Sequence, residues 1–228
     1  MTIQAGNLFA VKTGSDYVAM MEKFLLKVFS DAQGTIDSSV AAGNYRPCGN
    51  SDWEVEWTAK GGVPAVFPND TFTFGGVIQT DGGSAQKRAY GRMRCKQVEI
   101  NVQTGEQGAY VWHTVKAGGA PTSGSDVLLY DGTAIAADTT APVLACASGL
   151  GIDIVDGVAQ TNVEWSKLII AADFEPYVDS GVSGWYQRSP GNIDWALSYR
   201  RKFALWSELP TVDQVAIIKQ YTTTLLYW

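Results

Sequence analysis

One motif is written twice in this chain, and the repeat constrains the fold more than any other feature. Residues 37–53 read DSSVAAGNYRPCGNSDW and residues 179–195 read DSGVSGWYQRSPGNIDW, at an offset of 142 positions. Eight of the seventeen positions are identical, and Gly-Asn-x-Asp-Trp ends both segments. We interpret the match as an internal duplication of one structural unit, with chance similarity between two Gly- and Ser-rich loops as the alternative.

The residues that follow each motif alternate between apolar and polar side chains. The apolar positions are Trp53, Val55 and Trp57 in the first copy and Trp195, Leu197 and Tyr199 in the second. This alternation predicts a half-buried strand of the same phase in both copies. Upstream, residues 26–31 align with residues 168–173, which begin with a strand-like Leu-Ile-Ile run. Each copy is therefore predicted as a strand, a polar excursion containing an Arg, a Gly-Asn turn and a second strand.

Further elements are predicted outside the repeat. Residues 97–102 and 109–115 read as a β-hairpin, and residues 222–228 as a closing strand. A capping box after Pro210 predicts a short helix that ends near residue 220. Residues 17–29 carry apolar side chains at helical spacing, but the repeat alignment favours a strand in their later part.

Stretches rich in Gly, Pro, Ser and Asn suggest loops and boundaries. We expect long loops at residues 61–73 and 75–84, a linker at 117–125 and a second boundary at 136–142. The predicted fold is mainly β, with β-sandwich or barrel-forming sheets, one or two short helices and an internal duplication. We assign a first β-rich repeat with long loops to residues 1–140 and a second repeat to residues 141–228, with one composite domain as the alternative.

Composition favours a protein that associates with itself. Only 18% of the 228 residues are charged, below the roughly 25% of an average soluble domain. Aromatic residues make up 11% of the chain, so much amphipathic surface is available for burial against neighbours. The net charge of −6 argues against a nucleic-acid partner held by phosphate contacts. No stretch approaches the ~20 apolar residues of a membrane span, so we expect no membrane partner.

The residue types that usually carry catalysis are sparse. The single histidine, His113, shares a predicted strand face with Val111 and Val115, which favours a packed side chain over a general base. No nucleotide-binding Gly motif and no set of ligands with zinc spacing is present. Nothing supplies a nucleophile together with its base, so we expect no enzymatic activity, no cofactor and no metal.

Cysteines and charged residues are given structural interpretations. Cys48, Cys95 and Cys146 are read as reduced, mostly buried thiols, with a disulfide as the minority alternative. Glu54 and Glu56 are expected on the outer face of a strand. Basic residues gather in two clusters. The first comprises Lys87, Arg88, Arg92, Arg94 and Lys96, and the second comprises Arg188, Arg200, Arg201 and Lys202. We expect these side chains to form salt bridges, to be solvated, or to contact carboxylates of a neighbouring copy.

The second copy resembles the C-terminal half of phage tail tube (major tail) proteins. The resemblance rests on a strand at residues 168–174, a loop with Gly184-Trp185, and Gly-Asn-Ile-Asp-Trp opening a strand that bears Trp195 and Ser198. The predicted helix and final strand that follow complete it. It covers about the last 65 residues, and the first half only through the duplication. The resemblance implies a structural virion protein that is assembled in the host cytoplasm and self-associates into stacked, hexameric rings. A ring of three chains is the alternative if each repeat is a complete tube domain. Other virion proteins would be partners, and DNA would pass transiently through an acidic lumen.

The repeat and the resemblance together suggest which residues contact neighbouring subunits. These assembly or loop contacts are Trp185, Tyr186, Arg188, Arg46, Asp52 and Asp194. One alternative function is another phage head or tail component, such as a decoration, connector or baseplate protein. A second alternative is a carbohydrate-binding β-sandwich that would use Trp185, Tyr186 or Trp206 to stack on sugar rings.

Overall fold

The computed structural model shows a mainly β protein built from antiparallel sheets. No helix occurs among the residues that the structure describes, whereas one or two short helices were expected. The described residues are 11–13, 16–18, 21–31, 34–35, 44–45, 49–60, 64–79, 86–105, 108–131, 152–154, 159–160, 163–202, 216–217, 219–221 and 225–227.

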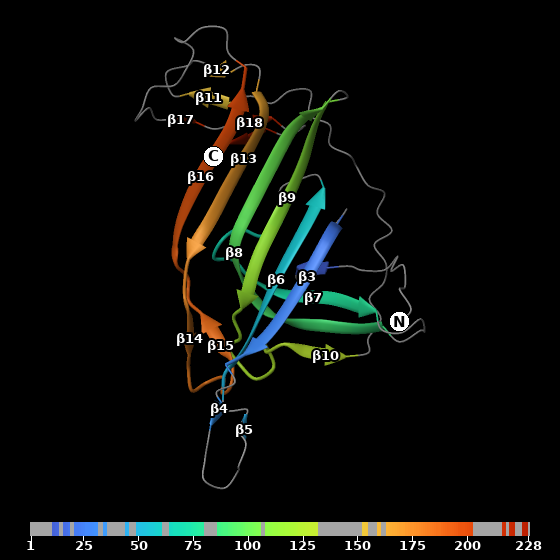
Figure 1. Ribbon diagram of the computed structural model, residues 1–228, viewed down its shortest axis with the longest axis vertical. Coiled ribbons are helices and arrows are strands. Elements are labelled where there is room, and N and C mark those ends of the chain that lie inside the picture. Colours follow the sequence, from blue (N-terminus) through green and yellow to red (C-terminus); the bar gives the residue numbers. More distant parts are fainter. Residues whose placement is uncertain are drawn as a thin grey trace.

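Six long strands lie side by side in the main sheet (Figure 1). They are β3 (Met21–Ser30), β6 (Ser51–Lys60), β8 (Gln86–Gly105), β9 (Gly108–Gly119), β13 (Val163–Asp173) and β16 (Asn192–Arg201). Their order is β16–β13–β8–β9–β6–β3, and every neighbouring pair is antiparallel. Among the described strands, β3 and β16 are therefore the two edges of this array, and they run in opposite directions.

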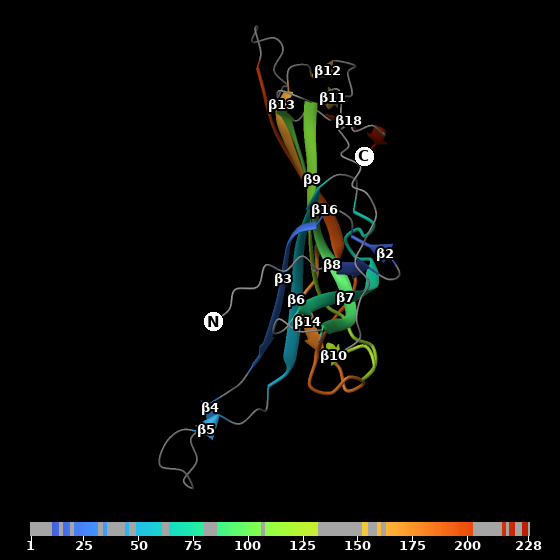
Figure 2. The same ribbon diagram turned by 90° about the vertical axis from the view of Figure 1, so that its right-hand side faces the viewer.

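A second group of strands joins the sheet through β8. Its first half pairs with β7 (Thr71–Gln79) and β10 (Leu129–Asp131), and β1 (Val11–Thr13) and β2 (Asp16–Tyr17) extend beyond β7. The second half of β8 pairs with β13, and a register shift between Cys95 and Gln97 marks the change. Seen edge-on, β7 and β10 lie to one side of β3 and β6, so they form a partial second layer (Figure 2).

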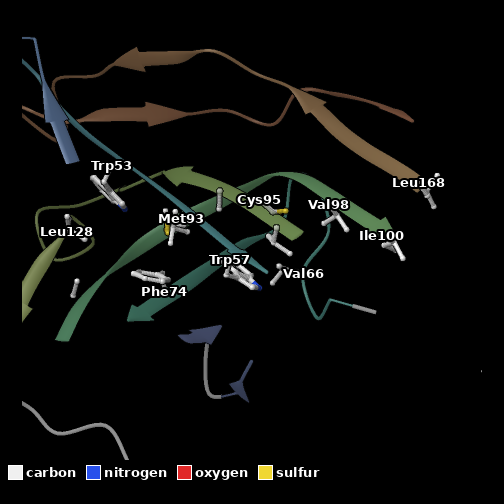
Figure 3. Packing of buried hydrophobic residues seen from close by; sticks show 14 of the residues in the cluster. Trp53, Trp57, Val66, Phe74, Met93, Cys95, Val98, Ile100, Leu128 and Leu168 are labelled. Carbon is white, nitrogen blue, oxygen red and sulfur yellow. The ribbon is translucent and has the colours of Figure 1, made fainter. Parts of the chain in front are cut away.

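The hydrophobic core fills the space between β6 and this second layer (Figure 3). The largest side chains with less than 2% exposure are Trp53, Trp57, Phe74, Met93, Ile100, Leu168 and Val55. Two aromatic pairs bridge the layers. Trp57 contacts Phe72 edge-on, with ring centroids 5.9 Å apart, and Phe24 stacks on Phe74, with ring centroids 5.6 Å apart. The predicted alternation on β6 is confirmed, because Trp53, Val55 and Trp57 all face this core.

The strand register confirms the internal duplication. β3 pairs with β6 as β13 pairs with β16, and equivalent pairs differ by the sequence offset of the repeat. The pairs Leu26–Val55 and Val28–Trp53 correspond to Leu168–Leu197 and Ile170–Trp195. A β-bulge recurs as well, between Met21 and Lys23 in one copy and between Val163 and Trp165 in the other. Agreement in pairing and in irregularity excludes chance similarity of two loops.

The polar excursion of each repeat holds a small hairpin at the same place. β4 (Gly34–Thr35) pairs with β5 (Asn44–Tyr45), and β14 (Pro176–Val178) pairs with β15 (Tyr186–Arg188). The two repeats flank the central hairpin β8–β9, the first through β6 and the second through β13. Strands from both sides of residue 140 therefore share one sheet.

Two helix predictions are corrected by the structure. Residues 21–29 lie in β3, so a helix through residue 29 is wrong and the strand alternative is confirmed. At the other end, β17 (Ala216–Ile217) pairs with β11 (Ile152–Ile154), and β18 (Lys219–Tyr221) pairs with β19 (Leu225–Tyr227). Strand pairing with distant or following residues overrides the local capping signal there.

Glycine-rich stretches were also misread. Residues 71–73 and 75–79 belong to β7 and not to the two expected loops. A Cβ on Gly76 would lie 2.7 Å from the Phe74 ring and 2.9 Å from the Phe24 ring, so this glycine makes room for their stacking. The expected linker at 117–125 begins inside β9, and Ala120 is buried. Loop residues 64–70 lie outside strands as predicted, whereas the boundary at 136–142 falls outside the described residues.

The remaining predictions on strands agree with the structure. The β8–β9 hairpin is confirmed, with Val102 opposite Val111. The expected closing strand is confirmed at Leu225–Tyr227. One further short strand, β12 (Ala159–Gln160), pairs with β11. In the described part of the chain, no helix has the length and apolar character needed to cross a membrane.

Candidate assembly site

The loop of the second repeat is held in shape by its own backbone contacts. The Asp179 carboxylate accepts a hydrogen bond from the Gly181 amide at 2.7 Å, and the Val182 amide donates to the Asp179 carbonyl at 3.3 Å. Gly184 has a φ of 82°, a conformation that glycine adopts without the steric penalty of a side chain. Val182 is buried and joins the main core cluster. The loop therefore presents residues 184–188 in a defined arrangement.

This loop docks on the Gly-Asn-x-Asp-Trp motif of the first repeat. The Ser51 amide donates to the Gly184 carbonyl at 2.7 Å, and Ser51 forms a parallel bridge with Trp185. The Trp185 ring meets Trp53 edge-on, with ring centroids 5.0 Å apart. The Tyr186 hydroxyl donates to the Asp31 carboxylate, and this hydrogen bond raises the pKa of Tyr186. The second repeat thus covers the turn that opens β6.

An ion pair lies at the centre of this contact. Arg188 Nη1 and Nη2 donate to Asp52 Oδ1 and Oδ2 at 2.7 and 2.5 Å, and Nη1 also donates to the Gly119 carbonyl at 2.6 Å. The side chains of Arg188 and Asp52 are only 5% and 3% exposed. Two-point pairing of a planar guanidinium with a carboxylate is the geometry that offsets the desolvation of both charges.

Glycines in β9 allow the Arg188 side chain to approach. A Cβ on Gly118 would lie 2.5 Å from Arg188 Nε, and one on Gly119 would lie 2.6 Å from the Trp53 ring. These glycines were expected to lie in a linker. They lie in β9 instead, because only a residue without a side chain leaves room there for the ion pair and the indole.

A second network ties the loop and the turn of the second repeat to the first half of β8. The Arg94 guanidinium donates to the Arg188 carbonyl at 3.0 Å and to the Asn69 carbonyl at 2.7 Å. The Asn69 side chain exchanges two hydrogen bonds with the Gly191 backbone, at 2.7 and 2.9 Å. Asn69 has a φ of 76°, which Asn tolerates better than most residues. The middle region of the chain therefore fixes the turn of the second repeat.

The two Gly-Asn-x-Asp-Trp turns share their local geometry. In each copy the Asp carboxylate accepts a hydrogen bond from the following Trp amide at 2.8 Å, at Asp52 and at Asp194. A Cβ on Gly49 would overlap the Asp31 carbonyl oxygen, and one on Gly191 would overlap the equivalent Asp173 oxygen. Glycine is thus required twice for the same steric reason.

The surroundings of the two turns are opposite. Trp53 is fully buried, whereas its counterpart Trp195 is 56% exposed and the neighbouring Ile193 is 55% exposed. Asp52 is buried beneath Arg188, whereas Asp194 is exposed and has no salt-bridge partner among the described residues. The second copy of the motif is therefore an uncovered version of the first.

The six predicted site residues divide into three groups. Arg188, Asp52, Trp185 and Tyr186 are brought together within one chain. Asp194 is exposed on β16, apart from them. Arg46 lies outside the described residues. Their contacts with other subunits stay predictions. Arg94, Asn69 and Gly119 were missed, because no sequence pattern links the middle region to the two turns.

The described residues form no group of three His, Cys, Asp or Glu side chains suited to a metal. His113 is buried beside Val111 and Val115 on β9, as predicted. A groove of about 200 Å³ beside Arg188 is lined by Lys27, Lys96 and Lys116 together with Glu54 and Glu56. Its lining mixes positive and negative side chains, as a solvated protein surface does.

Other predicted residues have structural roles. Cys95 is a buried free thiol, and burial together with the nearby Asp70 charge raises its pKa to about 12. Cys48 and Cys146 lie outside the described residues. In the basic clusters, Arg92 pairs with Asp126 at 3.8 Å, and Arg200 and Lys202 both pair with Glu164 at 3.1 Å. These contacts agree with the salt-bridging interpretation.

No model of a known protein family matches the sequence, and no curated protein matches it either.

Proposed function

We propose that this protein is a structural virion protein, the subunit of a phage tail tube, which self-assembles into stacked rings around a channel for DNA. The protein would be assembled in the host cytoplasm and would become part of the virion. The observation that carries the proposal is the pair of exposed, apolar edge strands β3 and β16 at opposite ends of one antiparallel array.

Long edge strands with apolar side chains are prone to pair with other chains. On β3, Leu25, Val28 and Phe29 are 38%, 48% and 45% exposed. On the other side, Ile193 and Trp195 of β16 and Trp165 of β13 are 55%, 56% and 37% exposed. Because β3 and β16 run in opposite directions, β3 of one copy can continue the antiparallel sheet into β16 of the next.

Such head-to-tail pairing uses two different surfaces of each subunit. A heterologous contact of this kind closes into a ring when the rotation between subunits permits, and ring closure removes both open edges. The net charge of −6 suits a channel for DNA, because like charge keeps a polyanion from adhering to the wall. Six chains per ring follow from the resemblance to tail tube proteins.

Negative-stain electron microscopy of the purified protein tests this function. We expect rings or tubes with an axial hole. A monodisperse monomer in light scattering that binds immobilised glycans would overturn the proposal in favour of a carbohydrate-binding module. Replacing Val28 with Lys on β3 provides a matched variant, because it adds a charge to an exposed edge position. We expect it to prevent assembly while the circular dichroism spectrum stays β-rich.

A further inference from the structure

We infer that β3 of one copy pairs with β16 of a second copy in one defined register, in which Lys27 lies directly opposite Asp194. The partner is therefore a second copy of this chain. The inference rests on the proposed self-assembly and names the residues that would set its register. The order of the side chains on the two edge strands and their charges carry it.

The strand pairings give the face of the sheet on which each edge side chain lies. One row of directly opposed residues crosses all six long strands on the face of the buried core, through Phe24, Trp57, Val115, Val98, Ile170 and Trp195. Side chains alternate along a strand, so Leu26 and Val28 share this face on β3, as Ile193 and Leu197 do on β16. Lys27 and Asp194 therefore lie together on the opposite face.

Lys27 and Asp194 are exposed charges that their own chain does not pair. Among the residues that the structure describes, neither has an ion-pair partner. Lys27 lies opposite Glu54 in the β3–β6 pairing, but the Glu54 carboxylate lies 4.0 Å from Arg188 Nη2. Asp194 Oδ1 accepts from the Trp195 amide at 2.8 Å, which leaves Oδ2 available to a cation. Each edge strand thus presents one charge that a second copy can neutralise.

The order of the side chains selects one register among those that keep the two apolar faces together. With Lys27 opposite Asp194, the apolar face pairs Val28 with Ile193, Leu26 with Trp195 and Phe24 with Leu197. A shift by two residues in one direction places Lys23 opposite Arg200, and like charges directly opposite each other are destabilising. A shift by two residues in the other direction places Asp194 opposite Leu25 and removes the charge pair. A shift by one residue would turn every apolar side chain to the wrong face.

The same register displaces the sheet by two residues at each contact between copies. The row that begins at Phe24 of one copy ends at Trp195, which would lie opposite Leu26 of the next copy. A closed barrel needs such a stagger, because its strands tilt relative to the barrel axis. The register shifted toward Leu25 would place Trp195 opposite Phe24 and give no stagger. Barrel closure therefore favours the same register as the charges.

Charge reversal tests the pair. We expect Lys27→Glu and Asp194→Lys each to raise the concentration needed for assembly by about fivefold or more, because an attractive cross-strand pair becomes repulsive at every contact. The two variants change the net charge in opposite directions, so a loss in both excludes net charge as the cause. Asp194→Asn, which keeps an acceptor for the Trp195 amide, should weaken assembly less than Asp194→Lys. Sedimentation velocity gives the readout, and circular dichroism checks that each variant stays β-rich.

Mixing the two reversed variants separates a contact between chains from an effect within one chain. In an alternating assembly, the glutamate at position 27 of one variant pairs with the lysine at position 194 of the other. At the next contact the native Lys27 pairs with the native Asp194. Equimolar mixing should therefore restore assembly, and the double variant Lys27→Glu/Asp194→Lys should assemble alone. Restoration in the double variant but not in the mixture would overturn a contact between chains.

Cysteine cross-linking measures the register without changing the charge pair. Leu25→Cys is mixed with Ala196→Cys, its opposite position, and in a matched control with Ser198→Cys, two residues along the same face. Opposite Cβ atoms lie about 4.5–5.5 Å apart and diagonal ones about 7–8 Å, whereas a disulfide needs about 3.5–4.5 Å. After oxidation with copper phenanthroline, we expect peptide mass spectrometry to find mainly the disulfide between positions 25 and 196. An excess at position 198, or a disulfide at neither position in assembled protein, would overturn the register.

The outcomes distinguish this inference from the proposed function. Tubes from the wild-type chain, together with normal assembly of both reversed variants, would overturn the Lys27–Asp194 pair and leave the tail tube function standing. Small wild-type oligomers that follow the mixing and cross-linking rules would support the pair and overturn the tube. A monomeric wild-type chain at all concentrations would overturn both.

Discussion

Arg188 and Asp52 form a buried two-point ion pair across 136 residues of chain, with nitrogen–oxygen distances of 2.7 and 2.5 Å. The pair joins the loop of the second repeat to the turn of the first. It therefore links the two copies of the duplication, which the main sheet holds on opposite sides of the β8–β9 hairpin.

Removing one partner of this pair should destabilise the fold strongly. We expect Arg188→Ala or Asp52→Ala to lower the free energy of unfolding by about 3–5 kcal/mol, because each leaves a buried charge without its partner. Replacing both by apolar residues, as in Asp52→Leu/Arg188→Met, should recover most of the loss. Urea unfolding gives these values.

Arg200→Ala is the matched control for the buried pair. Arg200 pairs with Glu164 at 3.1 Å, but its side chain is 70% exposed. Exposed ion pairs contribute about 1 kcal/mol or less, so this variant should unfold close to the wild type. Equal losses for Arg188→Ala and Arg200→Ala would contradict a special role for the buried pair.

The glycines of the repeated motif should not tolerate a side chain. A Cβ on Gly49 or Gly191 would overlap a backbone carbonyl, so Gly49→Ala and Gly191→Ala should each cost about 1–3 kcal/mol through displaced backbone. Gly124→Ala is the control, because no heavy atom lies within 4 Å of its Cβ position. Thermal unfolding of the three variants, recorded side by side, checks the contrast.

The two tryptophans of the motif should differ in their effect on stability. Trp53→Ala removes a fully buried indole and should cost about 3–5 kcal/mol, whereas Trp195 is 56% exposed and its replacement should cost under ~1 kcal/mol in the dissociated chain. Urea unfolding below the concentration of assembly measures both. Similar losses would mean that Trp195 is covered within one chain.

The Cys95 thiol should resist alkylation while the protein is folded. Burial and the charge of Asp70 raise its pKa to about 12, so little of the reactive thiolate exists at about pH 8. Iodoacetamide labelling followed by peptide mass spectrometry reports Cys95 separately from the other cysteines. We expect modification of Cys95 only after denaturant is added, and rapid labelling of the native protein would contradict its burial.

Acid should weaken the junction between β8 and β13 through Glu99. Burial opposes ionisation of Glu99, but hydrogen bonds from Asn101 and Lys167 outweigh it and lower the pKa. A lowered pKa in the folded state gives stability that is present above the unfolded value of about 4.3 and is lost as the pH falls through the folded pKa.

The size of this acid effect is limited by exposure. The Lys167 side chain, whose Nζ lies 2.9 Å from the Glu99 carboxylate, is 38% exposed. We therefore expect a contribution of about 0.5 kcal/mol, and a shallower dependence of stability on pH below about 4.3 in Glu99→Gln. Urea titrations across the acid range compare the two proteins, and identical slopes would exclude Glu99 as a contributor.

The sequence by itself determined the strands of the repeat and their phase. Alternation at Trp53, Val55 and Trp57 depends only on neighbours two positions apart, and its return at Trp195 predicted an equivalent strand. Alignment of the two repeats also predicted that the residues up to Phe29 form a strand, although the spacing of their apolar side chains suits a helix. Side-chain alternation depends on residues close together in the chain, and the repeat supplies a second copy of it. Both can therefore be recognised in the sequence alone.

Only the tertiary structure decided which copy of the motif is buried. Trp53 and Trp195 have the same local geometry, but the loop of the second repeat covers only the first, through the edge-on contact of Trp185 with Trp53. The Arg188–Asp52 pair and the close approach at Gly118 also join segments that are distant in sequence. Burial and pairing of this kind depend on how sheets pack, and side-chain order along one strand carries no information about it.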